Sequence, residues 1–576
     1  MRNRLLVITG SVVLALAAGC TAPDQVIPGE RLHSPTALPT TSYSDQTEPA
    51  KLTIALDTIP AWQGVTAGAD LKTTGKLTDV DGTYTWWTTE ADGSPFTYQP
   101  TDVVAFGDPQ TYTEVPGVLT FRGNNYRTAP AYGVAAVADK KLEVVWEQEI
   151  GEVRGEGSYW PGAGWTGQPL LVNWPKQTRE AMGFDAEFAD KDLVEVIYPV
   201  FEGKIYRLDL ETGKQTKEPI ETPGCGYKGT GSIDPRGYPL LYTGQGLHEA
   251  EGIGSCPWQY RIFDLIQNKQ VSGWDGTDPA APRTTPEGWG AFDSSALVNA
   301  ASDTLIEPSE NGLIYKAKLN AKFDPVAKTV SVNPTLTRMS YQTSIDPQAT
   351  FGIESSAVAY RNLMFASDND GNLLCWDANT LAIVWVRDVG DDSDATMVLE
   401  DTSDGVFLYH GNTVDKRGEQ GDKTTNLRKI NALTGELVWQ YDVQTQADYP
   451  NNGGLLATPA LGQGEVSDLV IFNVAKTRSA REGDMFALDK LTGEVVWHRT
   501  LGRYSWSSPV LITGDDGHQY GILCDSGGTM HLFDPNTGAD ISTLSLGKNV
   551  ESSPAVYNNM IVVASYAKKI WGIRIS

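Results

Sequence analysis

A short phrase that recurs along the chain constrains the fold more than any other feature of the sequence. Each copy places an Asp or Asn three residues before a Thr-Gly pair, and an apolar strand ending in Trp often follows. The acidic or amide side chain can bond a tight turn and Gly tolerates positive φ, so each copy predicts two strands joined by a turn. Self-similarity at intervals of tens of residues predicts a repeat architecture. The copies span residues 207–214, 429–439, 487–497 and 532–538, and a worn copy spans 375–385.

A second phrase opens each repeat: a variable residue, two small residues, often a proline, and an apolar run. Four strands per repeat are typical of a propeller blade. Eight openings therefore predict an all-β fold, an eight-bladed β-propeller of four-stranded antiparallel blades over residues 136–576. The variable residues of the eight openings are Thr166, Arg236, Asp293, Glu354, Asp394, Leu456, Trp506 and Glu551.

The last repeat predicts how the ring closes. After Glu551 the pattern supplies three strands, and no Val-Val-Trp strand follows before Ser576. Residues 142–150 carry such a strand without a hairpin of their own. We expect this strand to pair into the last blade, because closure removes the exposed sheet edges that promote aggregation.

The repeated phrase resembles the tryptophan-docking repeat of PQQ-type quinoprotein dehydrogenase propellers. Non-enzymatic relatives share that repeat, including the lipoprotein of the outer-membrane β-barrel assembly machine. Residues 119–128, Leu-Thr-Phe-Arg-Gly-Asn-Asn-Tyr-Arg-Thr, are similar to the segment that leads into many such rings. The resemblance implies the fold and leaves the function open, because one fold hosts many functions.

The N-terminal residues 1–19 predict a lipoprotein signal peptide. Arg2 and Arg4 precede an apolar stretch that is too short for a stable transmembrane helix. The stretch ends Leu-Ala-Ala-Gly before Cys20, which resembles a bacterial lipobox and implies cleavage before Cys20 and lipidation of its thiol. An ordinary secretory signal is the alternative. Residues 20–50, rich in Thr, Pro and Ser, predict a flexible tether, and the mature protein is expected to be lipid-anchored on the extracytoplasmic face of the cell membrane.

The segment between the tether and the ring lacks the repeat. Residues 51–135 are expected to form a small β-rich module packed on the propeller, including the segment that leads into the ring. Within them, residues 76–94 alternate apolar and polar side chains around Asp-Gly and predict a hairpin.

Charge and cysteine content limit the partners and the compartment. The 45 basic and 72 acidic residues give a net charge of −27, which argues against a nucleic-acid partner or an anionic membrane surface. Cys375 and Cys524 lie in apolar strand patterns and predict buried thiols. Cys225 and Cys256 flank a Gly-rich excursion, where a disulfide is expected outside the cytoplasm, with free thiols as the alternative.

The variable residues are the candidate binding site. The innermost strand of each blade begins near the axis of a propeller, so these residues should ring one mouth of the channel. The candidates at this central mouth are Arg236, Asp293, Glu354, Asp394, Trp506 and Glu551. Aromatic residues precede several of the openings: Trp160, Trp165, Trp289, Phe292, Phe351, Tyr449 and Tyr504. Carboxylates with aromatic walls suit a cation such as Ca²⁺, held by Asp293 and Glu354, or a sugar or peptide. A water-filled mouth with no dedicated ligand is the alternative.

Enzyme signatures are sparse. The resemblance implies that a quinoprotein dehydrogenase would hold Ca²⁺ and often a disulfide of adjacent cysteines, and no two cysteines are adjacent here. None of the six histidines has a metal-ligand spacing. We therefore predict a monomeric, non-catalytic binding or scaffold lipoprotein of the bacterial envelope, with an envelope protein or glycan as partner. No cofactor is expected, with Ca²⁺ as an option and PQQ disfavoured. A PQQ- and Ca²⁺-dependent dehydrogenase or a glycan-active propeller enzyme is the alternative.

Overall fold

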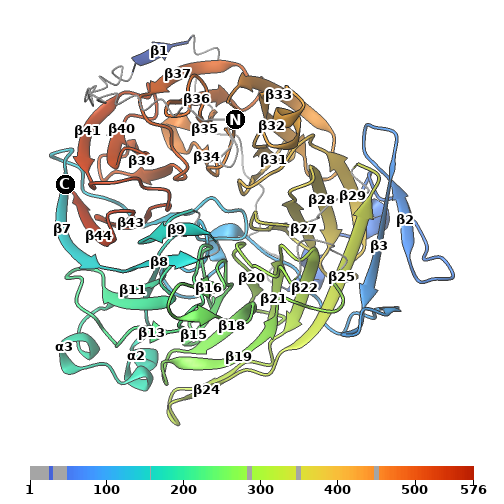
Figure 1. Ribbon diagram of the computed structural model, residues 1–576, viewed down its shortest axis with the longest axis horizontal. Helices are drawn as coiled ribbons and strands as arrows, with labels where there is room; N and C mark the ends of the chain where they lie inside the picture. Colours follow the sequence, from blue (N-terminus) through green and yellow to red (C-terminus); the bar gives the residue numbers. More distant parts are fainter. Residues whose placement is uncertain are drawn as a thin grey trace, which may run out of the picture.

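The computed structural model describes residues 25–29, 48–155, 157–165, 167–281, 288–345, 352–446 and 453–576. The chain forms an all-β propeller whose blades are mainly four-stranded and antiparallel. Eight sheets in these residues contain four or more strands, and they succeed one another around a ring in chain order (Figure 1). A helix with the length and apolar content needed to cross a membrane is not found among the described residues.

Four sheets come from the first part of the ring, and each runs outward from the axis. Their strands are β10 (Leu170–Asn173), β11 (Val194–Pro199), β12 (Lys204–Asp209) and β13 (Ile220–Glu221); β14 (Ser232–Ile233), β15 (Leu240–Thr243), β18 (Gln259–Asp264) and β19 (Lys269–Asp275); β20 (Leu297–Asn299), β21 (Thr304–Pro308), β22 (Leu313–Lys318) and β25 (Thr335–Thr343); and β26 (Val358–Tyr360), β27 (Leu363–Ser367), β28 (Asn372–Asp377) and β29 (Ile383–Asp388).

The other four sheets complete the ring. Their strands are β30 (Val398–Thr402), β31 (Gly405–Gly411), β32 (Thr424–Asn431) and β33 (Leu437–Gln444); β34 (Ala460–Leu461), β35 (Leu469–Ala475), β36 (Gly483–Asp489) and β37 (Val495–Leu501); β38 (Val510–Thr513), β39 (Gln519–Cys524), β40 (Thr529–Phe533) and β41 (Asp540–Ser545); and β42 (Ala555–Tyr557), β43 (Met560–Ser565), β44 (Lys569–Ile575) and β7 (Leu142–Glu149).

Short helices and separate hairpins lie in the connections between the blade strands. The helices are α1 (Pro49–Leu52), α2 (Lys176–Met182), α3 (Ala186–Ala189) and α4 (Lys416–Glu419), with 3₁₀ turns at Leu56–Thr58, Pro109–Thr111 and Gly464–Val466. The separate hairpins are β8 (Glu152–Gly155) with β9 (Ser158–Pro161), β16 (Glu249–Ala250) with β17 (Gly254–Ser255), and β23 (Lys322–Asp324) with β24 (Thr329–Ser331).

The core lies between the blades. Each adjacent pair of the eight sheets shares one cluster of buried apolar side chains, including the pair formed by the last sheet and the first. Burial between neighbours, which is the main favourable contribution to folding, therefore runs continuously around the ring.

Strand β7 closes the ring, as the sequence predicts. It pairs antiparallel with β44, from Glu149 opposite Lys569 to Leu142 opposite Ile575. Trp146 of β7 then reaches across to the first blade, where its indole N–H donates to the carbonyl oxygen of Leu210 at 2.7 Å. The first and last parts of the propeller are thereby joined by both a strand and a docked side chain.

The repeated tryptophans dock between blades, which confirms their predicted role. The indole N–H of Trp385 donates to Ala432 O at 3.0 Å, and that of Trp439 donates to Lys490 O at 3.0 Å. Trp497 donates to Pro535 O at 2.9 Å. Each ring packs on the turn glycine of the next blade, which has positive φ and leaves no room for a Cβ. The spacing of Asp, Thr-Gly and Trp in the repeat is therefore a blade-to-blade contact.

The two small residues of each opening form a second inter-blade contact. A backbone N–H in one blade donates to the hydroxyl of the equivalent residue in the next blade. These bonds link Gln168 to Thr230 at 2.8 Å, Ser295 to Ser356 at 2.9 Å, Ser356 to Thr396 at 2.8 Å, Thr458 to Ser508 at 3.0 Å and Ser508 to Ser553 at 3.1 Å. This ring of hydroxyls satisfies buried backbone donors near the axis and explains why the positions are Ser or Thr.

The strands of the expected N-terminal β-rich module pair directly with blades of the propeller. In the predicted hairpin region, β2 (Thr73–Lys76) pairs with β3 (Thr83–Thr89), and β4 (Pro95–Phe96) pairs with β3. Strand β3 also pairs with β25, so these strands enlarge that blade to seven strands. Strand β25 is long and would otherwise present a free edge, which β3 covers.

Part of the expected tether is also ordered on a blade. Strand β1 (Gln25–Pro28) pairs with the outer strand β37, where Gln25 lies opposite Thr500. The tether prediction is therefore wrong for residues 25–29. Its other residues up to 47 lie outside the described part of the chain, as does Cys20.

Residues 119–130 lie across the axis of the ring, between β5 (Gly117–Val118) and β6 (Ala131–Tyr132). Arg127 is fully buried and donates to the carbonyl oxygens of Ser295 and Ala357, at 2.6 and 2.9 Å. Arg122 donates to Pro509 O and Pro459 O in the opposite blades, at 3.0 and 3.2 Å. We call residues 119–130 the axial segment; by bonding to blades on both sides, it fills the channel at this level.

Candidate binding site at the propeller axis

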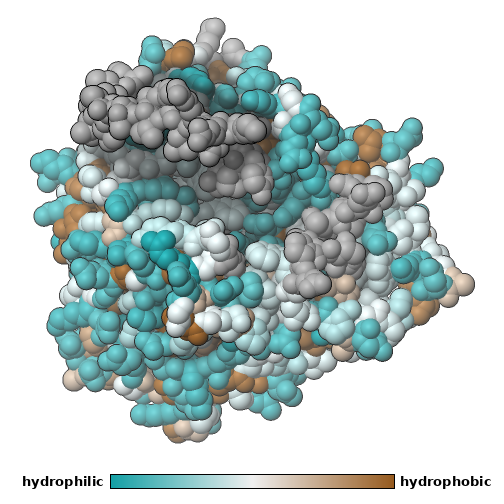
Figure 2. Space-filling view, viewed as in Figure 1, coloured by the Kyte–Doolittle hydropathy of each residue, from teal (hydrophilic) through white to brown (hydrophobic). Residues whose placement is uncertain are grey.

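A cavity lies at the axis, on the face where the innermost strands begin. Its volume is about 730 Å³, and hydrophilic residues border the hollow near the centre of this face (Figure 2).

 The residues that line the axial cavity are Ser158, Tyr159, Trp160, Trp165, Lys228, Glu354, Asp392, Asp394, Thr413, Asp415, Leu456, Tyr504, Trp506, Asn549, Glu551 and Tyr566.

The variable positions of the repeat supply part of this lining. Glu354, Asp394, Trp506 and Glu551 all face the cavity, and each stands four residues before the innermost strand of its blade. Asp293 occupies the same position before β20 and is buried at 3% exposure beside the lining residue Lys228. The structure therefore brings five of the six candidates together. Thr166 lies outside the described residues.

Arg236 is the exception, and its assignment to the mouth is corrected. It precedes β15, the second strand of its blade, and it pairs with Asp234 at 2.6 Å and Asp303 at 2.8 Å. The residue four before the innermost strand β14 is Lys228. The Pro-Leu after Arg236 resembles the opening phrase, whereas the actual opening of this blade reads Lys-Gly-Thr-Gly and has no proline.

Lys228 lies among three carboxylates. Its ammonium donates to Asp293 Oδ2 at 2.8 Å. Carboxylate oxygens of Asp293, Glu310 and Glu354 lie within 4.8 Å of one another. Burial opposes the charge on Lys228, but the three carboxylates together raise its pKa above the usual range.

Glu310 was not foreseen from the sequence. It is 2% exposed and accepts a 2.8 Å hydrogen bond from the indole N–H of Trp289 through Oε2. Burial, and then the charges of Glu354 and Asp293, raise its pKa well above the usual value. Its Oε1 and the Oδ1 of Asp293 have no hydrogen-bond partner in the described part of the chain. Glu310 lies in a turn between β21 and β22, where no repeat signal marks it.

A second group of carboxylates lines the next part of the wall. Asp392, Asp394 and Asp415 face the cavity together with Glu354. Burial raises the pKa of Asp392 well above the usual value, and the charges of Asp394 and Glu354 raise it further. Burial, and then the charge of Glu354, also raise the pKa of Asp394 well above the usual value. Asp394 therefore faces the axis, as its repeat position predicts.

Aromatic side chains make the opposite wall: Trp160, Trp165, Tyr504, Trp506 and Tyr566. Tyr566 donates through its hydroxyl to Glu551 Oε2 at 2.6 Å. The ammonium groups of two lysines already lie over these rings, Lys228 at 5.8 Å from Trp160 and Lys476 at 6.0 Å from Trp506. The wall is thus suited to positive charge.

Cys225 and Cys256 form a disulfide with a Cα–Cα distance of 5.6 Å. The bond holds the β16–β17 hairpin, whose Glu251 N–H donates to Arg154 O of the β8–β9 hairpin at 2.6 Å. The β8–β9 hairpin, which lines the cavity through Ser158, Tyr159 and Trp160, is thereby tied to the β16–β17 hairpin. Cys375 and Cys524 are buried free thiols.

The residues do not fit a bound quinone with its Ca²⁺. The disulfide joins cysteines 31 residues apart, not adjacent ones. Lys228 takes an oxygen of Asp293 that a cation would need. The donor chemistry of the three carboxylates alone suits a hard cation, but such an ion would have to compete with this ammonium.

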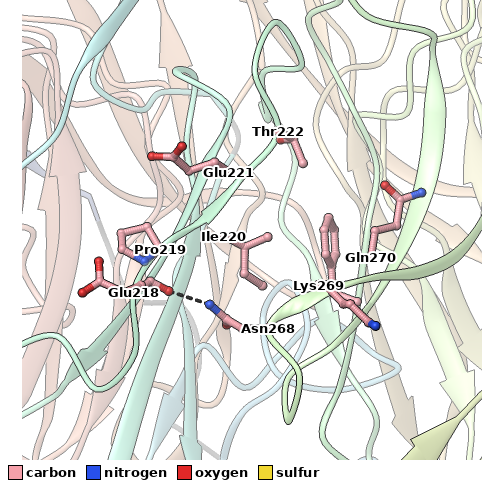
Figure 3. A pocket seen from close by; sticks show the side chains of 9 residues that line it. Glu218, Pro219, Ile220, Glu221, Thr222, Asn268, Lys269 and Gln270 are labelled. Atoms are coloured by element: carbon pink, nitrogen blue, oxygen red, sulfur yellow. Dashed lines mark hydrogen bonds between the residues drawn. The ribbon is translucent and has the colours of Figure 1, made fainter.

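A second, peripheral groove of about 440 Å³ lies between β13 and β19, and none of the predicted site residues line it. Figure 3 shows Glu218 and Glu221 on one side of it and Lys269 and Gln270 on the other, with a bond from Asn268 to the Glu218 carbonyl oxygen at 2.7 Å. Glu218 and Glu221 are exposed to solvent. The groove therefore offers carboxylates without the burial that marks the axial cavity.

The fold and the repeat are similar to those of PQQ-like propeller repeat proteins. Residues 331–505 and 481–576 match the family described as "Outer membrane protein assembly factor BamB".

Solved structures of similar fold include a "Europium-containing methanol dehydrogenase", at 12% identity over 81% of this chain and 99% of that chain, with a TM-score of 0.42. The computationally designed Ika8 protein is similar at 11% identity over 74% of this chain and 100% of that chain, with a TM-score of 0.41. No curated protein was found to match the chain. Neither structural likeness bears on activity.

Proposed function

We propose that this chain is a non-catalytic binding protein of the bacterial envelope that recognises a protein partner at the axial cavity. The observation that carries the proposal is the cavity itself. Variable positions of the repeat converge there with acidic and aromatic side chains, while the axial segment fills the channel beneath. A blind cavity with convergent polar groups is typical of a binding site.

The ring is proposed to have eight blades. The support is the set of eight sheets with four or more strands in the described residues, each sharing an apolar cluster with the next.

A protein partner is favoured over a glycan by the rim and by the matched family. Tyr159 on the β8–β9 hairpin and Ile253 on the neighbouring β16–β17 hairpin are 44% and 63% exposed and offer apolar contact area. The matched family is described as an assembly factor, which is a protein-binding role. A single molecule of this chain is proposed to carry the complete site.

The protein is further proposed to be a lipoprotein anchored through Cys20 on the extracytoplasmic face of the membrane. The support is the short apolar leader and the Leu-Ala-Ala-Gly-Cys sequence. The Cys225–Cys256 disulfide is compatible with an oxidising compartment.

Photo-crosslinking in cells tests the proposed site. A photoreactive amino acid at Tyr159 should give a discrete adduct with a protein. The matched control places it at Val326, which is 91% exposed on the distant β23–β24 hairpin, and should give none. Equal adducts from both positions, or none from Tyr159, would contradict recognition at the axis.

A further inference from the structure

The axial cavity has a large excess of negative charge. Five carboxylates line it, from Glu354, Asp392, Asp394, Asp415 and Glu551, and Lys228 is the one basic residue among the described lining residues. Lys228 is already paired with Asp293. Converging like charges are costly unless protons or cations offset them. Burial, and then the neighbouring carboxylates, raise the pKa values of Asp392 and Asp394 well above the usual value.

Two buried oxygens beside the cavity lack partners. Asp293 Oδ1 and Glu310 Oε1 are unbonded in the described residues, although their side chains are 3% and 2% exposed. Both carboxyl groups have an oxygen within 4.8 Å of Glu354, which lines the cavity. Unpaired buried acceptors are uncommon, and they indicate that a donor is missing from this end of the cavity.

On the aromatic wall, by contrast, buried hydrogen-bond donors lack acceptors. The indole N–H groups of Trp160, Trp165 and Trp506 are buried and have no acceptor among the described residues. Indole N–H groups usually find a partner when buried. A ligand that satisfies both walls must therefore carry a positive group for the carboxylates and acceptor oxygens for the indoles. A metal ion or a simple polyamine brings no such acceptor, whereas a peptide brings both.

The rim also offers a strand edge. Strand β9 pairs with β8 alone in the described residues, so the other edge of this two-stranded sheet has no strand beside it. Ser158, Tyr159 and Trp160 of β9 line the cavity. An extended peptide can add to a free strand edge through its main chain while its side chains enter adjacent pockets.

We propose that the cavity takes the lysine or arginine side chain of an extended segment of the protein partner, whose main chain lies along β9. This inference rests on the proposed function and specifies its ligand. The ammonium or guanidinium group would lie toward Glu354 and Asp394. The flanking peptide carbonyls would accept from the tryptophan indoles.

Titration of the purified protein with blocked peptides tests the inference. The probe is Thr-Val-Lys-Val-Thr, compared with peptides that carry arginine, norleucine or citrulline at the centre. The lysine and arginine peptides should bind roughly tenfold or more tightly than their neutral counterparts, because charge and cation–π contacts are lost in the latter. Methylation of the peptide backbone nitrogens should weaken the lysine peptide by a similar factor, because strand pairing is lost.

Matched variants locate the binding. The double variant Glu354→Gln, Asp394→Asn should lose the preference for lysine over norleucine, and Glu218→Gln, Glu221→Gln at the peripheral groove should retain it. Each double variant replaces two carboxylates with amides, so a general effect of net charge on peptide binding would appear in both. Melting temperatures of the variants check that each one is folded.

Three results would overturn the inference. Equal affinity for the lysine and norleucine peptides would show that the cavity does not recognise a cationic side chain. If free 1,5-diaminopentane binds as tightly as the lysine peptide, the peptide main chain makes no contribution to binding. If the Glu218→Gln, Glu221→Gln variant loses the preference for lysine over norleucine, the axial cavity is not where the peptide binds. A specific adduct at Tyr159 together with equal peptide affinities would leave the proposed function standing and this inference wrong.

Discussion

The ammonium of Lys228 lies 2.8 Å from Asp293 Oδ2, and the two residues hold the same repeat position in adjacent blades. Their side chains are 12% and 2% exposed, so the pair is largely withdrawn from water. Glu310 and Glu354 lie beside it. One lysine therefore serves as the internal counter-charge for a group of three carboxylates.

Replacing that lysine should expose a latent cation site. Lys228→Met is expected to lower the free energy of unfolding by about 3 kcal/mol, because breaking a buried pair leaves an uncompensated charge. Millimolar Ca²⁺ should then restore part of the stability, up to about 2.7 kcal/mol at a hundredfold excess over the dissociation constant. Thermal unfolding with and without Ca²⁺ measures both effects. The wild type, whose Asp293 is already paired, should respond less, and an equal response would show that Lys228 does not block the site.

The docking of Trp146 on Gly213 should be sensitive to one methyl group. Gly213 has φ +69°, and a Cβ there would lie 2.6 Å from the Trp146 ring. Gly213→Ala is therefore expected to combine backbone strain with a clash at the closure of the ring, and to cost about 2–4 kcal/mol. Gly183, with φ +62° and open space around it, is the matched control. Chemical denaturation should show a clearly smaller loss for Gly183→Ala, and equal losses would count against tight packing at the closure.

Trp439 should act in stability and not in recognition. Its indole is 8% exposed and bonded to Lys490 O, away from the residues that line the cavity. Trp439→Ala is expected to cost about 3–5 kcal/mol, because it removes a large buried ring. Peptide affinity of the folded fraction should be unchanged. Weaker binding with an unaltered melting temperature would reverse this assignment.

His531 should make stability depend on pH. Burial opposes its charge, but hydrogen bonds to Asp525 and Asp540 outweigh burial and raise its pKa from 6.5 to about 9. Since the folded state binds the proton more tightly, this stabilisation is complete below pH 6.5 and is lost as pH rises through about 9. The effect is at most about 3 kcal/mol. Urea unfolding at pH 6 and pH 10 measures it.

The matched variants for that measurement are His531→Gln and His518→Gln. His531→Gln should flatten the decline in stability between the two pH values. His518 is exposed, and its pair with Glu465 is screened by solvent, so its replacement should leave the decline in place. A decline of the same size in all three proteins would rule out His531 as its source.

Cys20 should be required for attachment to the membrane. Cys20→Ser is expected to release the protein into the soluble fraction or leave an unprocessed precursor, because the thiol is the proposed site of lipidation. Fractionation and gel mobility measure the two outcomes. A substituted protein that fractionates and migrates like the wild type would show that lipidation does not occur there.

Local chemistry made much of the architecture predictable. The Asp, Thr-Gly and Trp of each repeat encode a turn and a docked indole, and both depend on residues close in sequence or one blade away. The closing strand β7 was also predictable, because its Val-Val-Trp pattern had no hairpin partner of its own. Five of the six candidate mouth residues followed from their fixed offset before an innermost strand.

The sequence by itself thus determined the repeat, the closure of the ring and the position of most variable residues. The tertiary structure alone decided the charge balance of the cavity. Lys228 opens a blade without the usual proline, Glu310 lies in an unmarked turn, and β3 joins a blade from far along the chain. These features depend on contacts between distant segments, and such contacts leave no periodic signal in the residues that make them.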